Sequence, residues 1–224
     1  MTTLYLVRHG QASFAAANYD NLSELGHRQS AWLGEHFASR GIVFARAVCG
    51  TLDRQRQTAR TLLDAMGSAT TVVEHPGWNE YSGDALYKAY HGEGWAKARA
   101  KGDVREFYRT IKAALLLWAD EKLAGDLPET WREFGERGAA AMRAACEGLP
   151  PDACVLAASS GGAISRAVAT LLQAPAQTAI ELNLQYRNSA FCEIFVSPRS
   201  MRMVSFNCIP HLDRPDRADA ITYS

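Results

Sequence analysis

A histidine near the amino terminus, His9, lies between Arg8 and Gly10 at the end of a short apolar run. A neutral imidazole attacks phosphorus without first losing a proton near pH 7, provided that one ring nitrogen is held as a donor while the other faces the substrate. A tight turn through Gly10 offers a backbone carbonyl for the first nitrogen. The planar guanidinium of Arg8 suits bidentate binding of phosphate oxygens. The residues alone leave open a hydrogen-bonded core histidine beside a surface arginine.

Two charged residues farther along the chain suit the same chemistry. Arg54 falls in the first turn of a helix predicted over 52–66, where its charge and the helix N-terminus both favour an anion. Glu80 follows Trp78 and Asn79, and an apolar neighbour raises a carboxyl pKa so that the group stays protonated for a departing oxygen. Taken alone, Glu80 is more simply a surface carboxylate. Together with His9, these residues predict a nucleophile, an anion cradle and an acid.

Short β-favouring runs alternate with helical segments through most of the chain, which predicts an α/β fold. We expect a three-layer sandwich with a mainly parallel sheet and helices on both faces. Ligands of such sheets bind beyond the carboxyl ends of the strands, so the segments that follow predicted strands converge at one edge. These segments are 8–10, 50–51, 79–80 and 159–161. The predicted strands are 3–7, 45–49, 70–74, 153–158 and a hairpin of 189–197 with 201–207; the predicted helices are 22–40, 52–66 and one that ends near 173.

The segment from about 84 to 147 is rich in Ala, Lys, Glu, Arg, Trp and Tyr and has no strand pattern. We interpret it as a helical insertion over the carboxyl edge of the sheet, within a single domain that spans 1–224. Its aromatic residues at helical spacing are mostly core. Those near its start are candidates for selecting the leaving group: Tyr81, Tyr87 and Tyr90. Breaks are expected near Gly102, Gly125 and Pro128.

Composition narrows the class of protein. The chain has 24 basic and 24 acidic residues, and this balance predicts neither a nucleic-acid partner nor an acidic membrane surface. Five scattered cysteines without a CxxC pair favour reduced thiols and no zinc site, and the amino terminus lacks a signal-peptide pattern. We therefore expect a cytoplasmic protein that needs no metal or other cofactor. The polar tail after Asp213 is expected to be loose.

Several motifs, taken in chain order, resemble the histidine phosphatase superfamily, the group of phosphoglycerate mutase-like enzymes. The resemblance covers nearly the whole chain. It implies an α/β sandwich in which His9 is phosphorylated, Arg8 and Arg54 hold the phosphate, and Glu80 donates the proton. The motifs are Leu6-Val7-Arg8-His9-Gly10, Leu22-Ser23-Glu24-Leu25-Gly26 with Gln29, 52–59, Asn79-Glu80, 159–164, and Asn207 with His211-Leu212.

The chain departs from the family at two positions. Ser160 stands where the family has a second phosphate-contacting histidine, and Ala15 aligns with a common asparagine that Ser13 or Asn18 would replace. Ser160 still donates a hydrogen bond, and the amides at Gly161 and the next glycine lie at a helix start. A lost electrostatic donor of this kind costs roughly 10²- to 10³-fold in rate. The predicted substrate-binding residues are Arg8, Gly10, Ser13, Asn18, Arg54, Ser160 and Gly161.

Four functions remain open at this point. The first is a phosphomonoester hydrolase that acts on a small phosphorylated substrate, with Glu80 as general acid and base. A mutase with the same chemistry is the second, and a catalytically weakened relative that binds phosphorylated ligands is the third. The fourth is a serine hydrolase, because Ser159 and Ser160 lie between a strand and a helix, as at a nucleophile elbow. That reading leaves Arg8, His9 and Arg54 without a role. The substrate and the oligomeric state are not specified.

Overall fold

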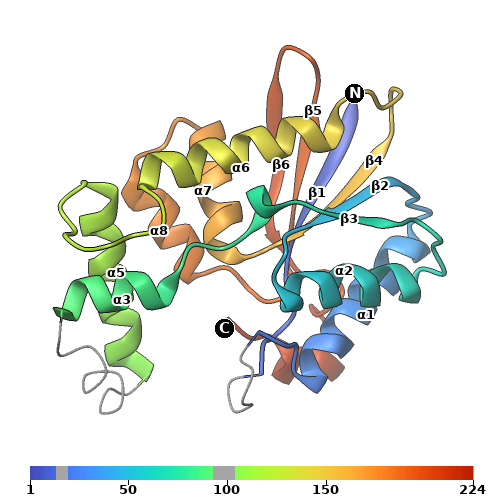
Figure 1. The fold of residues 1–224 in the computed structure, drawn as a ribbon. Coiled ribbons are helices and arrows are strands. Elements are labelled where there is room, and N and C mark those ends of the chain that lie inside the picture. Colours follow the sequence, from blue (N-terminus) through green and yellow to red (C-terminus); the bar gives the residue numbers. More distant parts are fainter. Residues whose placement is uncertain (14–19, 93–103, 224) are drawn as a thin grey trace.

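A computed structural model describes residues 1–13, 20–92 and 104–223, and Figure 1 shows a single sheet with helices on both faces. The sheet has six strands in the order β3-β2-β4-β1-β5-β6. β1, β2, β3 and β4 run parallel, and β5 and β6 form the expected antiparallel hairpin at one edge. The predicted mainly parallel α/β sandwich is confirmed. The strands are β1 Thr2–Arg8, β2 Phe44–Cys49, β3 Val72–Glu74, β4 Cys154–Ser159, β5 Phe191–Val196 and β6 Met201–Cys208.

The central strand β1 is apolar on both faces because both faces are covered. Leu4 and Leu6 belong to the core on one side of the sheet, whereas Tyr5 and Val7 belong to the core on the other side. Successive side chains of a strand point to opposite faces, so a strand covered on both sides is apolar throughout. The continuous apolar run before His9 is therefore typical of a buried strand that leads from the interior to the edge of the sheet.

One pair of helices covers each face of the sheet. α1 (Glu24–Ser39) and α2 (Asp53–Ala65) pack on the face that carries Tyr5, and α6 (Trp131–Cys146) and α7 (Gly161–Leu171) pack on the face that carries Leu4 (Figure 1). α1 begins after Ser23, whose hydroxyl accepts a hydrogen bond from the amide of Gly26 at 3.0 Å. Helices thus cover both faces of the central strands.

The described part of the predicted helical segment between 84 and 147 forms helices that are separated by an irregular stretch over 120–130, where the breaks near Gly125 and Pro128 were expected. α3 (Gly83–His91) and α5 (Val104–Ala119) lie beside the sandwich, where they share an apolar cluster with α8 (Ala176–Leu184). No pattern in the sequence marks α8 as a separate helix. α6 starts in the same cluster and continues onto the sheet, so the segment contributes to the main core as well. The expected break near Gly102 lies outside the described residues.

The expectation of a loose tail after Asp213 was wrong. Residues Pro215–Ala220 form a short 3-10 helix, η3, which is fixed on α1. The guanidinium of Arg217 lies 4.3 Å from the ring centroid of Trp32, and Gln29 Nε2 donates to Ala220 O at 2.7 Å. Gln29 is buried, so its amide requires partners that the tail supplies. A polar composition concealed these contacts.

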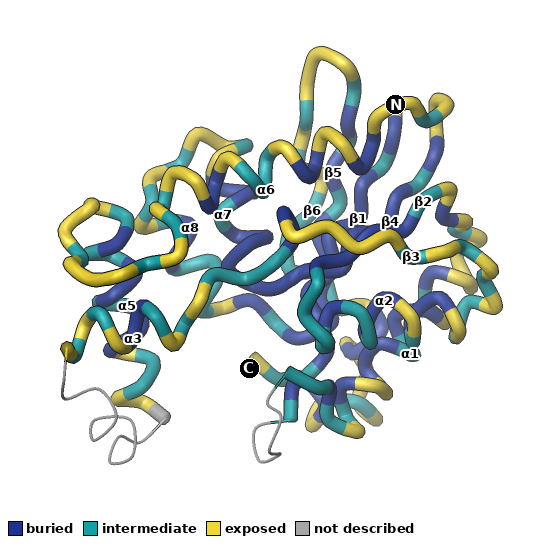
Figure 2. Tube along the Cα trace, viewed as in Figure 1, coloured by how far each residue is buried: buried dark blue, intermediate teal, exposed yellow. Residues whose placement is uncertain are grey.

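Figure 2 shows that the central strands β1 and β4 are buried up to their carboxyl ends, whereas β3 and β6 at the two edges of the sheet carry exposed residues. His9, Ser159 and Ser160 are all among the buried polar residues. No helix in the described part of the chain is long and apolar enough to cross a membrane.

Candidate active site

The ends of β1 and β4 bring His9 and Ser160 together. The two strands pair in parallel, with Arg8 opposite Ser159, and the amide of His9 donates to Ser159 O at 2.9 Å. One residue farther along, His9 and Ser160 therefore occupy neighbouring positions where the strands end. α2, which carries Arg54, begins shortly after the adjacent strand β2. The predicted convergence of these segments is thus present in the structure.

Two hydrogen bonds fix the tautomer of His9. The ring Nδ1 lies 2.7 Å from Gly10 O, and a carbonyl only accepts, so Nδ1 carries the proton. On the other side, Arg54 Nε donates to His9 Nε2 across 3.2 Å, so Nε2 presents its lone pair. Burial, followed by the charges of Arg54 and Arg8, holds the pKa of His9 well below its ordinary value, although the Gly10 carbonyl acts in the opposite direction. The imidazole is therefore uncharged near neutral pH.

Gly10 gives the turn its shape. A Cβ at position 10 would lie 2.3 Å from Gly26 O, so only glycine allows this approach to α1. The Gly10 amide donates to Thr58 Oγ1 of α2 at 3.1 Å. The sequence predicts Gly10 as a substrate-binding residue, but its amide is used within the protein. Its visible contributions are the turn and the carbonyl that holds His9.

The two arginines differ in their partners. Arg8 is buried, donates to Tyr186 O and lies beside Gly161, where a Cβ would be 3.4 Å from Arg8 Nε. Arg54 forms an ion pair with Asp20, which also accepts a hydrogen bond from the amide of Asp53 at 2.8 Å. The Asp20 carboxylate thus binds both the N-terminus of α2 and the guanidinium of Arg54. These two groups together favour an anion. Sequence reasoning missed Asp20.

Glu80 reaches the start of α7 from the opposite side of the edge. Its Oε2 accepts a hydrogen bond from the amide of Gly162 at 2.8 Å, and its Oε1 accepts one from the amide of Tyr81 at 3.1 Å. Burial raises the pKa of Glu80 above its ordinary value, while the two amides and the charges of Arg54 and Arg8 oppose the rise. The shift is in the direction that a proton donor requires.

The loop that carries Glu80 is held from α6. Arg137 donates to three carbonyl groups of this loop, at 3.3 Å (Pro76), 3.1 Å (Gly77) and 2.9 Å (Asn79). The same guanidinium binds both carboxylate oxygens of Glu129, at 2.7 and 2.8 Å. Because both charges are largely screened from water, this bidentate pair fixes the guanidinium in one orientation. Arg137 was also absent from the predicted site.

The remaining predicted site residues are placed as follows. The Ser160 hydroxyl accepts a hydrogen bond from Gln55 Nε2 at 2.8 Å, and Gly161 lies beside Arg8. Ser13 does not supply a free donor, because its hydroxyl donates to Leu22 O at 3.1 Å, which closes the loop before α1. Asn18 lies outside the described residues. The Gly162 amide, expected to help with phosphate, binds Glu80 instead.

His211 is paired with a serine other than the one a serine hydrolase would need. Its Nε2 lies 2.7 Å from Ser189 Oγ, and both side chains are buried. Ser160 is bound to Gln55, and Ser159 Oγ donates to Trp78 O at 2.6 Å. Neither serine at the predicted elbow therefore has His211 as its base, and the serine hydrolase reading loses its histidine. The described residues contain no group of three or more His, Cys, Asp or Glu side chains suited to a metal ion.

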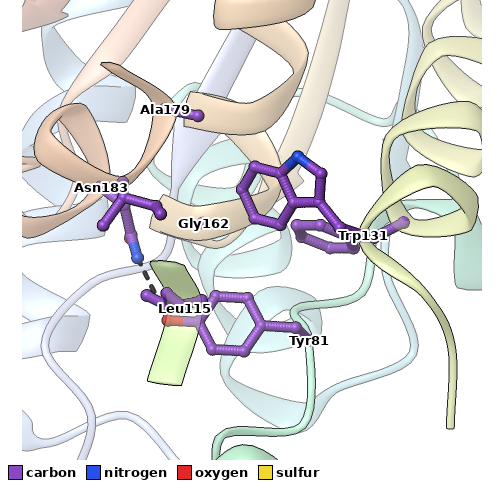
Figure 3. A pocket seen from close by; sticks show the side chains of 8 residues that line it. Tyr81, Leu115, Trp131, Gly162, Ala179 and Asn183 are labelled. Atoms are coloured by element: carbon purple, nitrogen blue, oxygen red, sulfur yellow. Dashed lines mark hydrogen bonds between the residues drawn. The ribbon is translucent and has the colours of Figure 1, made fainter. Parts of the chain in front are cut away.

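A small cavity of about 10 Å³ borders the Glu80 side of the site (Figure 3). Tyr81 lines it, and Asn183 Nδ2 donates to the phenolic oxygen of Tyr81 at 3.1 Å. Of the three tyrosines proposed to select a leaving group, Tyr81 lies next to Gly162, whereas Tyr87 is buried and stacks on Phe107. The other lining residues are Leu115, Trp131, Phe134, Gly162, Ala179 and Ile180.

Comparison with known proteins identifies the family. The model of the histidine phosphatase superfamily (branch 1) matches residues 4–209. A 2,3-bisphosphoglycerate-dependent phosphoglycerate mutase of Bartonella quintana is 31% identical over 85 residues, which are 35% of this chain and 41% of that relative. The chain thus matches less than half the length of this curated relative.

Solved structures share the fold over nearly the full length. The phosphoserine phosphatase of Entamoeba histolytica, in complex with 3-phosphoglyceric acid, is 18% identical with a TM-score of 0.67, over 95% of this chain and 100% of that one. The phosphoglycerate mutase of Bacillus anthracis is 20% identical with a TM-score of 0.65, over 94% of each chain. Identities this low establish the fold and leave the substrate open.

Proposed function

The chain belongs to the histidine phosphatase superfamily, branch 1, and from that premise we propose that it is a phosphomonoester hydrolase whose intermediate is a phosphohistidine on His9. One observation carries the proposal: His9 is held as the neutral tautomer with its Nε2 lone pair beside Arg54. This is the protonation state that a nucleophile toward phosphorus requires. Glu80 lies on the facing side, and burial raises its pKa in the direction that a general acid requires.

In the first step, the Nε2 lone pair of His9 attacks the phosphorus atom, and the bond from phosphorus to the ester oxygen breaks. Glu80 transfers its proton to that oxygen, so an alcohol leaves and Glu80 becomes a carboxylate. The phosphoryl oxygens take the place of Nε2 as partners of Arg54, while Arg8 provides a second guanidinium. Positioning and positive charge lower the barrier of such a transfer.

In the second step, water attacks the phosphohistidine. The Glu80 carboxylate accepts a proton from the water, the phosphorus–nitrogen bond breaks, and its electron pair returns to Nε2. Inorganic phosphate leaves, and both His9 and Glu80 regain their starting protonation states. The Gly10 carbonyl keeps the Nδ1 proton throughout, so the same nitrogen acts in each cycle.

A phosphoglycerate mutase-like phosphotransferase is the second candidate, and the similarity to the Bartonella quintana mutase favours it. A mutase returns the phosphoryl group to an organic acceptor instead of water. The described residues around His9 offer Arg8 and Arg54 for the transferred phosphate and show no further cationic clamp for a sugar acid. For this reason we place hydrolysis first. A weakened relative that only binds phosphorylated ligands is the third candidate, because Ser160 replaces a histidine.

Intact mass spectrometry after an alkaline quench tests the proposal. The enzyme is incubated briefly with a panel of small phosphomonoesters, and we expect an acid-labile gain of one phosphoryl group that His9→Ala abolishes. The matched control is His27→Ala, an exposed histidine of α1, which keeps the gain. A folded wild-type protein that binds phosphate esters without any gain would leave the binding relative. Phosphoryl transfer to an added alcohol acceptor in preference to water would favour the mutase.

We also propose a cytoplasmic location and a small phosphorylated substrate. All five cysteines are free thiols, as expected in a reducing compartment. The net charge of zero gives no overall electrostatic attraction to nucleic acid, so we propose no nucleic-acid partner.

A further inference from the structure

Ser160, which stands in place of a second histidine, is held by one buried side chain. Gln55 is fully buried, and its Nε2 donates to Ser160 Oγ at 2.8 Å and to Trp78 O at 3.0 Å. A primary amide has two such protons, and both are used. The amide cannot be turned over, because its oxygen would then face the Trp78 carbonyl. The orientation of Gln55 is therefore fixed by the backbone that leads to Glu80.

This orientation decides what the Ser160 hydroxyl does. A hydroxyl carries one proton, and Ser160 accepts from Gln55, so it keeps its own proton for another acceptor. The described part of the protein offers no acceptor for that proton, although Ser160 is only 1% exposed. A buried donor without a partner is costly, which points to an acceptor that arrives with a ligand.

The surroundings of Ser160 identify that ligand. His9 is its neighbour across the ends of β1 and β4, Gly161 lies beside Arg8, and the Gly162 amide donates to Glu80. An acceptor that enters between these groups is an oxygen of the phosphoryl group that is transferred to His9. The arginines supply the charge there, and Ser160 supplies a directed neutral hydrogen bond.

We propose that Gln55 is a positioning residue that fixes Ser160 as a hydrogen-bond donor to the transferred phosphoryl group. The Gln55–Ser160 pair thereby substitutes for the second histidine. The inference rests on the proposed phosphotransfer at His9 and adds a role that the arginines cannot fill. Its test must therefore separate Ser160 from the other partner of Gln55, the Trp78 carbonyl.

A double-mutant cycle makes that separation. Ser160→Ala removes the donor and is expected to lower kcat roughly 10²-fold, with a smaller effect on KM. Gln55→Leu, similar in size but without an amide, is expected to lower kcat roughly 10-fold or more because Ser160 loses its orientation. In the double variant, the loss stays within about twofold of that of Ser160→Ala, since Gln55 acts through Ser160. Losses that multiply, or a Ser160→Ala variant as active as wild type, would overturn the proposal.

Ser159→Ala is the matched control for the Trp78 carbonyl. It removes the other donor to Trp78 O, at 2.6 Å, and leaves the Gln55–Ser160 contact in place. Its effect on kcat, whatever the size, should multiply with that of Ser160→Ala. Thermal melting identifies variants that fail to fold, and Gln55→Met replaces Gln55→Leu if the latter is unfolded. Should the effect of Ser159→Ala also vanish in the Ser160→Ala background, the coupling would not be specific to Gln55.

Orthovanadate binding keeps this inference distinct from the proposed function. If wild type forms no phosphohistidine with any ester, the proposed function is wrong. The same double-mutant cycle is then measured through the affinity for orthovanadate, by calorimetry. Weaker binding in Ser160→Ala, with no further loss from Gln55→Leu, supports the pair. Unchanged binding in Ser160→Ala overturns it. If phosphohistidine forms but the losses of kcat in the two variants multiply, the proposed function is supported and the positioning role of Gln55 is wrong.

Discussion

The two sides of the site carry opposite kinds of groups. On the His9 side, Arg8 and Arg54 bring full positive charges to a ring nitrogen. On the Glu80 side, the hydrogen-bonding groups are an uncharged hydroxyl at Ser160 and a backbone amide at Gly162, and burial raises the pKa of Glu80. Positive charge is thus concentrated around the nucleophile, and the uncharged hydrogen-bond donors lie toward Glu80.

Burial explains how one site maintains both states. It lowers the pKa of His9 and raises the pKa of Glu80, because in each case the charged form loses hydration. The arginines add to the first shift and oppose the second. Burial thus shifts each group toward its uncharged form, the form in which the proposed nucleophile and the proposed acid act. Variants that remove charge from the first side or protons from the second should behave differently.

The largest effect is expected from removing charge on the His9 side. Arg54→Met should lower kcat roughly 10³-fold, because a guanidinium that stabilises a transferring phosphoryl group contributes at least this much. Steady-state kinetics on the best phosphomonoester measures the loss. Arg56→Met is the matched control: it lies two residues away on α2 and pairs with Asp53 and Glu74. Its activity should stay within about twofold of wild type. A loss of less than tenfold for Arg54→Met would contradict the cradle.

Next in size is the loss of the acid on the Glu80 side, and this loss should depend on the leaving group. Glu80→Gln should lower kcat roughly 10²-fold for alkyl phosphates, which need a proton, and far less for nitrophenyl phosphate, whose leaving group departs as an anion. A charge defect at Arg54 has no reason to discriminate in this way. Equal losses for the two esters would assign Glu80 to binding instead of proton transfer.

The pH dependence of kcat/KM separates the two sides by the same logic. His9 acts unprotonated, and its lowered pKa places the acid limb below the ordinary histidine value near 6.5. Glu80 acts protonated, and its raised pKa places the alkaline limb above the ordinary value near 4.5. Activity on alkyl phosphates therefore falls as pH rises through the pKa of Glu80. Glu80→Gln should remove this limb and retain the other.

The sequence predicted the His9 side better than the Glu80 side. An unbroken apolar strand, a glycine turn and an arginine in the first turn of a helix are local patterns, and the structure confirms what they placed at the sheet edge. The contacts of Gln55 with Ser160 and of Arg137 with the loop before Glu80 join residues 105 and about 60 positions apart. No periodicity reports such long-range hydrogen bonds, and Asp20 was hidden for the same reason. The tail after Asp213 looked solvated because its buried partners lie on α1.

Loosening the Glu80 loop should have a smaller effect than removing Glu80. Arg137→Met breaks three hydrogen bonds to the carbonyls of 76–79 and leaves Glu80 itself intact. We expect kcat on alkyl phosphates to fall roughly 10-fold, with little change for nitrophenyl phosphate, because a small displacement of the acid impairs proton transfer. Arg132→Met, an exposed arginine of α6 paired with Glu136, is the control and should have no effect. A loss shared by both esters would indicate a general packing defect.

The smallest effect concerns stability behind His9 and should leave chemistry unchanged. The amide of Ser189 donates to His9 O at 3.2 Å, and the Ser189 hydroxyl is paired with His211. Burial, followed by the charges of His36 and Arg217, lowers the pKa of His211 to about 3. In the unfolded chain, His211 binds a proton below about pH 6.5, whereas in the folded protein it binds one only below about pH 3. The free energy of unfolding therefore decreases as pH falls through this range.

The slope of this loss is the measurement. One such group changes the free energy of unfolding by about 1.4 kcal/mol per pH unit, which urea unfolding at several pH values resolves. His211→Asn should lower stability near neutral pH through lost packing, yet flatten the dependence between pH 4 and 6 by about this slope. The difference from wild type cancels the contributions of His9 and Glu80, which both proteins share. His27→Asn, in an exposed histidine of α1, should keep the wild-type slope. An unchanged slope in His211→Asn would mean that His211 titrates normally and that His9 is not supported from behind by a neutral ring.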